Sequence, residues 1–522
     1  MRFFNITGSC DPAYHYMIPA ERRLPDLEAL ITKRAYFVVH APRQTGKTTT
    51  LRALARTLTA EGRYAALHAS CETGEPAQDD FRRAQEAVLN DIGRNAADLP
   101  AELRPPSPWP TAPDTSLLSA GLEAWCQVCP RPVVLFLDEI DALRGESLRS
   151  VLRQLRAAYP SRPRRAPWSV VLCGLRDVRD YKAASGGDPS RLGTSSPFNI
   201  KTKSVRLGDF TPDEVRALYH QHQDETGQPF TSEALERAIE MTQGQPWLTN
   251  ALANEVIEEM GVKPPTPITR ESIDEAKERL ILARATHLDS LVARLHETRV
   301  HKVIEPLIDG AVLAADAYDD NFSYVRDLGL IAPGNPVRVA NPIYREIIVR
   351  VLGASFEASI ETDPRSFVGA DGRLDLERLL QEFASFWREH GDVLTAGLSY
   401  HEVAPQLVVM AYLQRVVNGG GQIEREYGVG RGRIDLLVRW PYRAPSGERL
   451  VQREAIELKV WRPGRPDPIA QGLIQLDAYL GRLGLDSGWL VIFDRRADAA
   501  PIEERTRFEV ACTGRAVRVL RG

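Results

Sequence analysis

The feature that most constrains this chain is a short loop between a predicted buried strand and a predicted helix. Residues 36–40 (YFVVH) are almost uninterruptedly apolar, as expected for a strand that is covered on both faces of a sheet. The next residues, 41–48 (APRQTGKT), match the phosphate-loop pattern GxxxxGK[ST], except that Ala41 replaces the first glycine. Such a loop curls its backbone N–H groups around phosphate oxygens at a helix N-terminus. The amino-terminal part is therefore predicted to bind a nucleotide.

Within this loop, two side chains have predicted chemical roles. Lys47 is expected to reach the β- and γ-phosphates of ATP, and the Thr48 hydroxyl is expected to help hold Mg²⁺. The predicted cofactor-binding positions are Ala41, Pro42, Arg43, Gln44, Thr45, Gly46, Lys47, Thr48 and Thr49. Ala41 fits the pattern only if its backbone angles stay in the regions open to L-residues. The alternative is a chance match in an ordinary strand–turn–helix.

A second motif follows at residues 133–139 (VVLFLDE). A carboxylate at the end of a buried strand can hold Mg²⁺ through water, and the next one can polarise the attacking water. We assign the first role, as metal ligand, to Asp138 and the second, as catalytic base, to Glu139. An apolar strand that ends in two acids is common by itself, so the prediction depends on its pairing with the loop. Strands alternating with helices over 33–207 predict a parallel sheet covered on both faces.

The two motifs together resemble P-loop ATPases with an extra strand between them, of the AAA+/STAND type, over roughly residues 1–350. The resemblance implies that Arg176, which follows the apolar run 169–173 (SVVLC), senses the γ-phosphate. It also implies that Pro246, in the sequence GQP of a helical lid, approaches the nucleotide base. A solvated arginine on a loop and an ordinary helix–helix turn are the alternatives for these two positions.

A separate constellation lies near the carboxyl terminus, where Asp435 precedes Glu457 and Lys459 (ELK). Residues two apart on a strand share a face, so Glu457 and Lys459 point the same way, and Asp435 on a neighbouring strand can meet them. Two carboxylates for Mg²⁺ and an ammonium that orients or deprotonates water are the parts needed for metal-assisted phosphodiester hydrolysis. Only nine of the 66 basic residues are lysines, which makes Lys459 more informative.

This constellation resembles the PD-(D/E)XK nuclease superfamily over about 395–500. The resemblance makes Asp435 and Glu457 metal ligands, and it adds Glu402 on the preceding helix and Gln471 and Gln475 on the following helix as catalytic candidates. Alternating charges on a strand face and ordinary helix capping are the alternatives. Ten basic against five acidic residues at 425–465 suit a phosphate-backbone groove or a solvated basic face.

The predicted fold class is an α/β multidomain protein, consistent with 522 residues. It contains a P-loop parallel sheet with helices on both faces, a helical lid, a winged helix, and an α/β restriction-endonuclease-like domain with a mixed sheet. The predicted order is a lead-in at 1–32, the ATPase core at 33–207, the lid at 208–268, the winged helix at 269–352, a linker and helical connector at 353–394, and the nuclease-like domain at 395–522.

Composition bounds the function. No apolar run approaches the ~18–20 residues of a membrane span, and the first residues lack a signal-peptide pattern, so we expect a cytoplasmic protein without a membrane partner. We predict an ATPase joined to a Mg²⁺-dependent endo- or exonuclease that acts on nucleic acid, DNA rather than RNA, with room for a homo-oligomer and for a role in defence against foreign DNA. The alternatives are a regulatory ATPase whose carboxy-terminal domain binds DNA without cutting, and a motor-like ATPase whose winged helix grips DNA.

Overall fold

The chain divides into two compact units. The computed structural model describes residues 2–175, 200–283, 286–295, 297–308, 313–314, 319–357, 367–395, 404–417, 420–429, 432–444, 446–496, 498–512 and 515–522. The amino-terminal unit comprises Met1–Leu291 and Ala315–Ile343, and the carboxy-terminal unit comprises Val292–Ala314 and Tyr344–Gly522. Within the described residues, no helix has the length and apolar character that crossing a membrane requires.

The amino-terminal unit contains a five-stranded sheet in the order β2-β3-β4-β1-β5, in which every pair is parallel. The strands are β1 (Tyr36–His40), β2 (Ala65–Ser70), β3 (Val133–Asp138), β4 (Ser169–Gly174) and β5 (Lys201–Arg206). The predicted parallel sheet is confirmed, and β4 separates the two strands that carry the sequence motifs. Both motifs therefore end at the same edge of the sheet, because the carboxyl ends of parallel strands share an edge.

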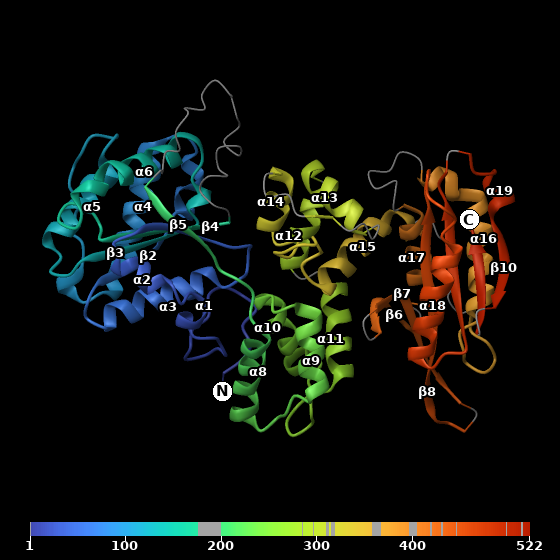
Figure 1. Cartoon of the computed structure of the whole chain (residues 1–522). Coiled ribbons are helices and arrows are strands. Elements are labelled where there is room, and N and C mark those ends of the chain that lie inside the picture. The colour runs from blue at the N-terminus through green and yellow to red at the C-terminus, as the bar shows by residue number, and fades with distance from the viewer. Residues whose placement is uncertain are drawn as a thin grey trace. The chain divides into compact units, whose positions relative to one another are not determined.

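Helices cover both faces of this sheet (Figure 1). One apolar cluster joins α2 and α3 to Phe37 and Phe136, and a second joins α4, α5 and α6 to Tyr36 and Leu135. The helices are α1 (Ala20–Arg23), α2 (Leu27–Thr32), α3 (Lys47–Ala60), α4 (Phe81–Asn95), α5 (Leu117–Val128) and α6 (Gly145–Ala158). Short 3₁₀ turns occupy η1 (Glu72–Ala77), η2 (Ala96–Asp98), η3 (Ala101–Leu103), η4 (Ile140–Ala142) and η5 (Tyr159–Ser161).

A group of helices follows the sheet in the same unit, and those between residues 208 and 268 lie in the range predicted as the lid. Thr211 begins α8 with a capping box, in which its side chain and that of Glu214 satisfy each other's backbone N–H groups. The helices are α8 (Pro212–Thr226), α9 (Ser232–Thr242), α10 (Pro246–Asn254), the π-helix η7 (Glu255–Glu259), α11 (Arg270–Leu282) and α14 (Asp320–Asp327). An antiparallel bridge joins Ile331 and Val339, within the range predicted as a winged helix.

The carboxy-terminal unit contains a mixed six-stranded sheet in the order β10-β11-β9-β8-β7-β6. The strands are β6 (Gln422–Val429), β7 (Gly432–Arg443), β8 (Arg449–Trp461), β9 (Ser487–Asp494), β10 (Arg507–Cys512) and β11 (Ala516–Arg521). Strands β8, β9 and β11 run parallel, while β6, β7 and β8 pair antiparallel, as do β10 and β11. The sequence interpretation did not include β10 and β11.

Helices lie on both faces of the second sheet as well. Leu476 and Leu480 of α18 pack against Leu437, Ala455 and Leu490 on one face. On the other face, Trp387 of α16 packs against Phe493 with the ring centroids 4.9 Å apart, so the stretch predicted as a connector contributes to the core. The remaining helices are α12 (Thr286–Arg294), which spans the division between the units, α13 (Thr298–Ile308), α15 (Pro342–Glu357), α16 (Leu376–Thr395), α17 (Ala404–Val417), α18 (Ile469–Leu483) and α19 (Ile502–Arg505).

Candidate functional site

The phosphate loop adopts a closed curl around the ammonium group of Lys47. Lys47 Nζ donates hydrogen bonds to Ala41 O at 2.9 Å and to Pro42 O at 2.8 Å. The loop positions with positive φ are Gln44 (57°) and Gly46 (83°). Ala41 is not among them, so the alanine at the first glycine position is compatible with the backbone. An ammonium group has three N–H donors, so a phosphate oxygen can accept from Lys47 while these two carbonyl oxygens are still bound.

The Asp138 carboxylate is the centre of a buried hydrogen-bond network beside this loop. Its Oδ2 accepts from Thr48 Oγ1 at 2.6 Å and lies 3.1 Å from His68 Nε2, while its Oδ1 accepts from Glu139 N at 2.9 Å. Burial raises the pKa of Asp138, but hydrogen bonds from His68 and Thr48 outweigh it and lower the value to about 2. The carboxylate therefore stays ionised, and Thr48 keeps its oxygen lone pairs for a cation while donating its proton.

Glu139 lies at the exposed end of β3 with its backbone in the left-handed region, at φ 50°. A non-glycine residue in that region is strained and is common at functional sites. Burial of the carboxyl group and the nearby Glu72 and Asp138 raise the pKa of Glu139, while Lys47 lowers it. A carboxylate with a raised pKa at the end of this strand suits a general base.

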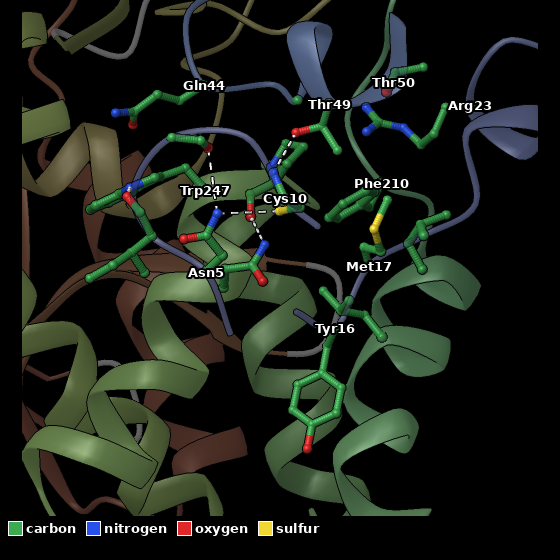
Figure 2. Close-up of a pocket in the computed structure, with 17 residues that line it drawn as sticks. Asn5, Cys10, Tyr16, Met17, Arg23, Gln44, Thr49, Thr50, Phe210 and Trp247 are labelled. Atoms are coloured by element: carbon green, nitrogen blue, oxygen red, sulfur yellow. Dashed lines mark hydrogen bonds between the residues drawn. The ribbon is translucent and has the colours of Figure 1, made fainter. Parts of the chain in front are cut away.

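A pocket lies beside the loop, and Figure 2 shows the side chains around it. Its walls come from three parts of the amino-terminal unit: the lead-in before the sheet, the start of α3, and the lid. The lining residues that Figure 2 labels are Asn5, Cys10, Tyr16, Met17, Arg23, Gln44, Thr49, Thr50, Phe210 and Trp247. Its position next to the phosphate loop suits a nucleoside.

Sequence reasoning missed the lead-in wall of this pocket. Cys10 N donates to Thr49 Oγ1 at 3.0 Å, and Trp247 Nε1 donates to Ile6 O at 2.9 Å. Arg23 donates to Thr45 O at 3.2 Å and to Gly208 O at 2.5 Å, and its guanidinium lies 4.6 Å from the centre of the Phe210 ring. The aromatic and polar residues before the first strand were the available signal, but they match no motif.

Pro246 lines the pocket, and its predicted approach to the nucleotide base stays a prediction. It follows Gly244, which adopts φ +77° and accepts a hydrogen bond from Phe210 N at 2.7 Å. A Cβ at Gly244 would lie 1.9 Å from Phe210 O, so only glycine fits this contact. Gln245 caps α10 through Leu248 N and approaches Gln44 O at 3.4 Å, which links the lid to the loop. The predicted sensor Arg176 lies outside the described residues.

The three carboxy-terminal candidates lie together on one face of the second sheet. The register, with Leu436 opposite Ile456, places Asp435 beside Glu457, and Asp435 Oδ2 accepts from Leu458 N at 2.8 Å. Lys459 Nζ donates to Glu457 Oε1 at 2.6 Å. This is also the face that α18 covers, because Ala455 on the same side of β8 belongs to the α18 cluster.

Glu457 carries the clearest sign of an incomplete site. Its side chain is 2% exposed, and among the described residues its Oε2 has no hydrogen-bond partner. Burial and the nearby Asp435 raise the pKa of Glu457 to about 7, against the opposing effect of Lys459. A buried oxygen without a donor is costly, and a cation is a group that would satisfy it. The donor set of two carboxylates therefore fits a hard divalent metal.

The helix-borne candidates differ in their surroundings. Gln475 on α18 is half-buried, and within the described residues its Oε1 also has no hydrogen-bond partner. Gln471, one turn earlier, is exposed. Glu402 lies outside the described residues. Of the basic residues near the trio, Arg439 pairs with Glu424 at 3.0 Å, and Arg453 is exposed.

Comparison with known proteins bears on the amino-terminal unit. Residues 31–181 match the family model described as an AAA domain. No curated protein matches the chain. Among solved structures, the chain is similar to a Walker-type ATPase of Pyrococcus abyssi, with 12% identity, 66% of this chain and 99% of that chain covered, and a TM-score of 0.46.

Two further solved structures are similar at the same low level. The Holliday junction branch migration motor RuvB of Thermotoga maritima has 14% identity, covers 63% of this chain and 93% of its own, and has a TM-score of 0.33. Cdc6p from Pyrobaculum aerophilum has 15% identity, covers 66% and 97%, and has a TM-score of 0.35. These values carry no conclusion about function. The AAA match and the loop geometry identify the amino-terminal region as a P-loop ATPase domain of the AAA type.

Proposed function

We propose that this chain is an ATP-regulated, Mg²⁺-dependent nuclease, in which a STAND-type ATPase switch controls a PD-(D/E)XK phosphodiesterase domain. The observation that carries the proposal is the convergence of Asp435, Glu457 and Lys459 on one sheet face, around a buried Glu457 oxygen that has no donor among the residues the structure describes. Structural carboxylates are normally hydrogen-bonded when buried, whereas a metal ligand is left open in the absence of its metal.

At the ATP site, the chain supplies positions for phosphate, cation and water. Thr48 and Asp138 would hold Mg²⁺, directly or through water, and Lys47 would neutralise the phosphates. Mg²⁺ contributes charge neutralisation between the phosphates when it is bound. Glu139 accepts a proton from the attacking water, and Arg176 senses the γ-phosphate.

At the nuclease site, Asp435 and Glu457 hold Mg²⁺, which when bound neutralises charge on the scissile phosphate. The backbone N–H of Leu458, on the neighbouring strand, donates to Asp435 Oδ2 and fixes the orientation of this carboxylate, including that of its other oxygen. Lys459 releases Glu457 and orients the attacking water. The flanking helices would help to position the metal ligands or the phosphate through Glu402, Gln471 and Gln475.

The link between ATP and the downstream part of the chain is supported by a close contact. Gly329, in the turn after α14, adopts φ +83°, and a Cβ there would lie 2.8 Å from Pro42 Cβ in the phosphate loop. Arg206, at the end of β5, donates to Arg326 O in the same region at 3.3 Å. If phosphate binding rearranges the phosphate loop, Pro42 would therefore displace this turn, and such a coupled movement is what a nucleotide switch requires.

The test is degradation of a supercoiled plasmid with Mg²⁺, with and without ATP. We expect cleavage by the parent protein, and a loss of at least ~10²-fold in Glu457→Gln and Lys459→Ala, because each change removes a group that acts in the reaction. Glu454→Gln is the matched control, since Glu454 lies three residues before Glu457 on the same strand and therefore on the opposite face. Cleavage that persists in Asp435→Ala/Glu457→Gln would refute the nuclease proposal.

A second candidate is a regulatory ATPase whose carboxy-terminal unit binds DNA without cutting it. Lys459 and Glu457 form an ion pair at 2.6 Å. If this pair persists when metal is present, Lys459 does not orient water, which favours the regulatory ATPase. Retardation of a plasmid in a gel without cleavage, weakened by salt, would support this candidate, because phosphate contacts release counterions.

DNA as the partner, a homo-oligomeric state and a role in defence against foreign DNA are part of the main proposal, that of an ATP-regulated nuclease.

A further inference from the structure

His68 is a buried imidazole that neither sequence motif includes. It lies on β2 and is 6% exposed. Its Nε2 is 3.1 Å from Asp138 Oδ2, the same oxygen that accepts the Thr48 hydroxyl proton at 2.6 Å. The parallel register places His68 opposite Phe136, on the α3 side of the sheet, so the ring lies beside the strand that ends in Asp138. His68 therefore adds a donor to a carboxylate that the motifs assign to the cation.

The number of donors to Asp138 determines what that carboxylate can do. Oδ1 accepts from Glu139 N, and Oδ2 accepts from Thr48 and from the His68 ring N–H. Two carboxylate oxygens offer about four acceptor sites. Thr48 and His68 occupy both sites of Oδ2, Glu139 N occupies one at Oδ1, and the Cys173 thiol is a further, weaker donor to this carboxylate. Thr48 can offer its lone pairs to a cation only while its proton is directed at Asp138, which requires the carboxylate to keep this rotamer.

We infer that His68 is a positioning residue for the cation that accompanies ATP, because its ring N–H holds the Asp138 carboxylate in the orientation that receives the Thr48 proton. The inference rests on the proposed Mg²⁺–ATP site and assigns a role to a residue outside both motifs. Partners that orient a metal-binding carboxylate typically change metal affinity 10–100-fold when they are removed. Among the described residues, the side-chain hydrogen bond of His68 goes to Asp138 and not to the phosphate loop, so its effect is expected on the cation and not on the nucleotide alone.

The experiment separates cation binding from nucleotide binding. ATP affinity is measured by calorimetry in EDTA and in Mg²⁺, and Mn²⁺ affinity of the ATP complex is measured by electron paramagnetic resonance. For His68→Leu we expect the ATP affinity measured in EDTA to be unchanged. The Mn²⁺ affinity of the ATP complex should fall about tenfold, and so should the increase in ATP affinity that Mg²⁺ produces in the parent. His68→Gln, whose amide also donates, should stay within about threefold of the parent.

His222 supplies the matched control. It is also buried, at 2% exposed, in the same unit, but its Nε2 lies 3.0 Å from Gln228 Oε1. His222→Leu should lower the unfolding temperature without changing the cation dependence. If His68→Leu does not fold, His68→Asn makes the same comparison, because the shorter amide does not reach Asp138.

The outcomes are distinct. Equal Mn²⁺ affinity in the parent and in His68→Leu would overturn the inference, as would an equal loss of ATP affinity in EDTA and Mg²⁺, which indicates a purely structural histidine. If the parent protein binds no ATP under either condition, the proposed ATP site itself fails, independently of His68.

Discussion

Three carboxylates in this chain have different environments, and their pKa values follow from them. Asp138 is buried among donors and stays ionised, whereas Glu139 and Glu457 are surrounded by other acids and have raised pKa values. A carboxylate that is always ionised, such as Asp138, suits a permanent cation ligand. A carboxylate with a raised pKa suits a group that exchanges protons or a metal ligand whose metal is not bound. Single substitutions at these positions test the assignments.

Removing Lys47 or Glu139 should affect different steps of ATP hydrolysis. Lys47→Ala removes a charge that neutralises phosphate, so ATP affinity should fall by at least about tenfold. Glu139→Gln should bind ATP as the parent does and hydrolyse it at least ~10²-fold more slowly, because the base is lost. Calorimetry and phosphate release measure the two effects. Lys33→Ala, at an exposed lysine, is the control, and parental turnover in Glu139→Gln would contradict the assignment.

The raised pKa of Glu457 predicts how the carboxy-terminal site depends on pH. A metal binds the ionised carboxylate, so below about pH 7 a proton competes and Ca²⁺ or Mn²⁺ affinity should fall about tenfold per pH unit. Above that pH the affinity should level off. Calorimetric titration from pH 5.5 to 8.5 measures this dependence, and an affinity that does not vary with pH in this range would count against the site.

The same shift has a consequence for stability without metal. The folded-state pKa exceeds the ordinary value of 4.5, so the stabilising contribution of protonated Glu457 is complete below that value and is lost as the pH rises through about 7. In EDTA, the unfolding temperature of the carboxy-terminal unit should therefore fall between pH 5 and 8. Glu457→Gln should reduce this fall, and the same slope in both proteins would contradict the prediction.

Two elements meet at the nucleotide pocket through their backbones. The lid turn at Gly244 and the segment at Phe210 approach so closely that no side chain fits between them. The lead-in completes the wall through hydrogen bonds from Cys10 to Thr49 and from Trp247 to Ile6. The position of the lid over the phosphate loop therefore depends on a glycine.

Gly244→Ala should destabilise the amino-terminal unit by roughly 2–4 kcal/mol, the sum of left-handed backbone strain and overpacking. ATP affinity should fall with it, because the lid would be displaced. Chemical unfolding and calorimetry measure the two effects. Gly261→Ala is the control: it also has positive φ (67°), but its Cβ would meet nothing within 4 Å, so only roughly 1 kcal/mol of strain is expected. Equal effects of the two changes would show that the contact with Phe210 is unimportant.

The whole molecule consists of two units with separate cores, and each carries one of the candidate sites. Separate cores predict two unfolding transitions rather than one. ATP with Mg²⁺ at about 100 times its dissociation constant should stabilise the amino-terminal transition by about 2.7 kcal/mol and leave the other unchanged. Scanning calorimetry measures this, with Lys47→Ala as the control that should not respond. A single transition that shifts as one would indicate tightly coupled units.

Local patterns were sufficient for the phosphate loop, the strand that ends in Asp138 and the parallel sheet. The loop and its helix are adjacent in sequence, and the buried strands of a parallel sheet are apolar throughout, so both signals are short-range. The mixed character of the second sheet was also predicted, but β10 and β11 were not, since their short alternating runs lie at the end of the chain without a motif. The role of the trio Asp435, Glu457 and Lys459 stays a prediction.

The pocket wall, His68 and the open oxygen of Glu457 became visible only in three dimensions. His68 precedes Asp138 by a helix-containing crossover, and the two meet because β2 and β3 are neighbours in the sheet. Asn5 and Cys10 reach the nucleotide pocket because the lead-in packs against the lid and α3. Periodicity and spacing determine which residues form a strand or a helix. Which side chains then share a buried, low-dielectric space depends on how those elements pack, and that packing sets their hydrogen bonds and their charge.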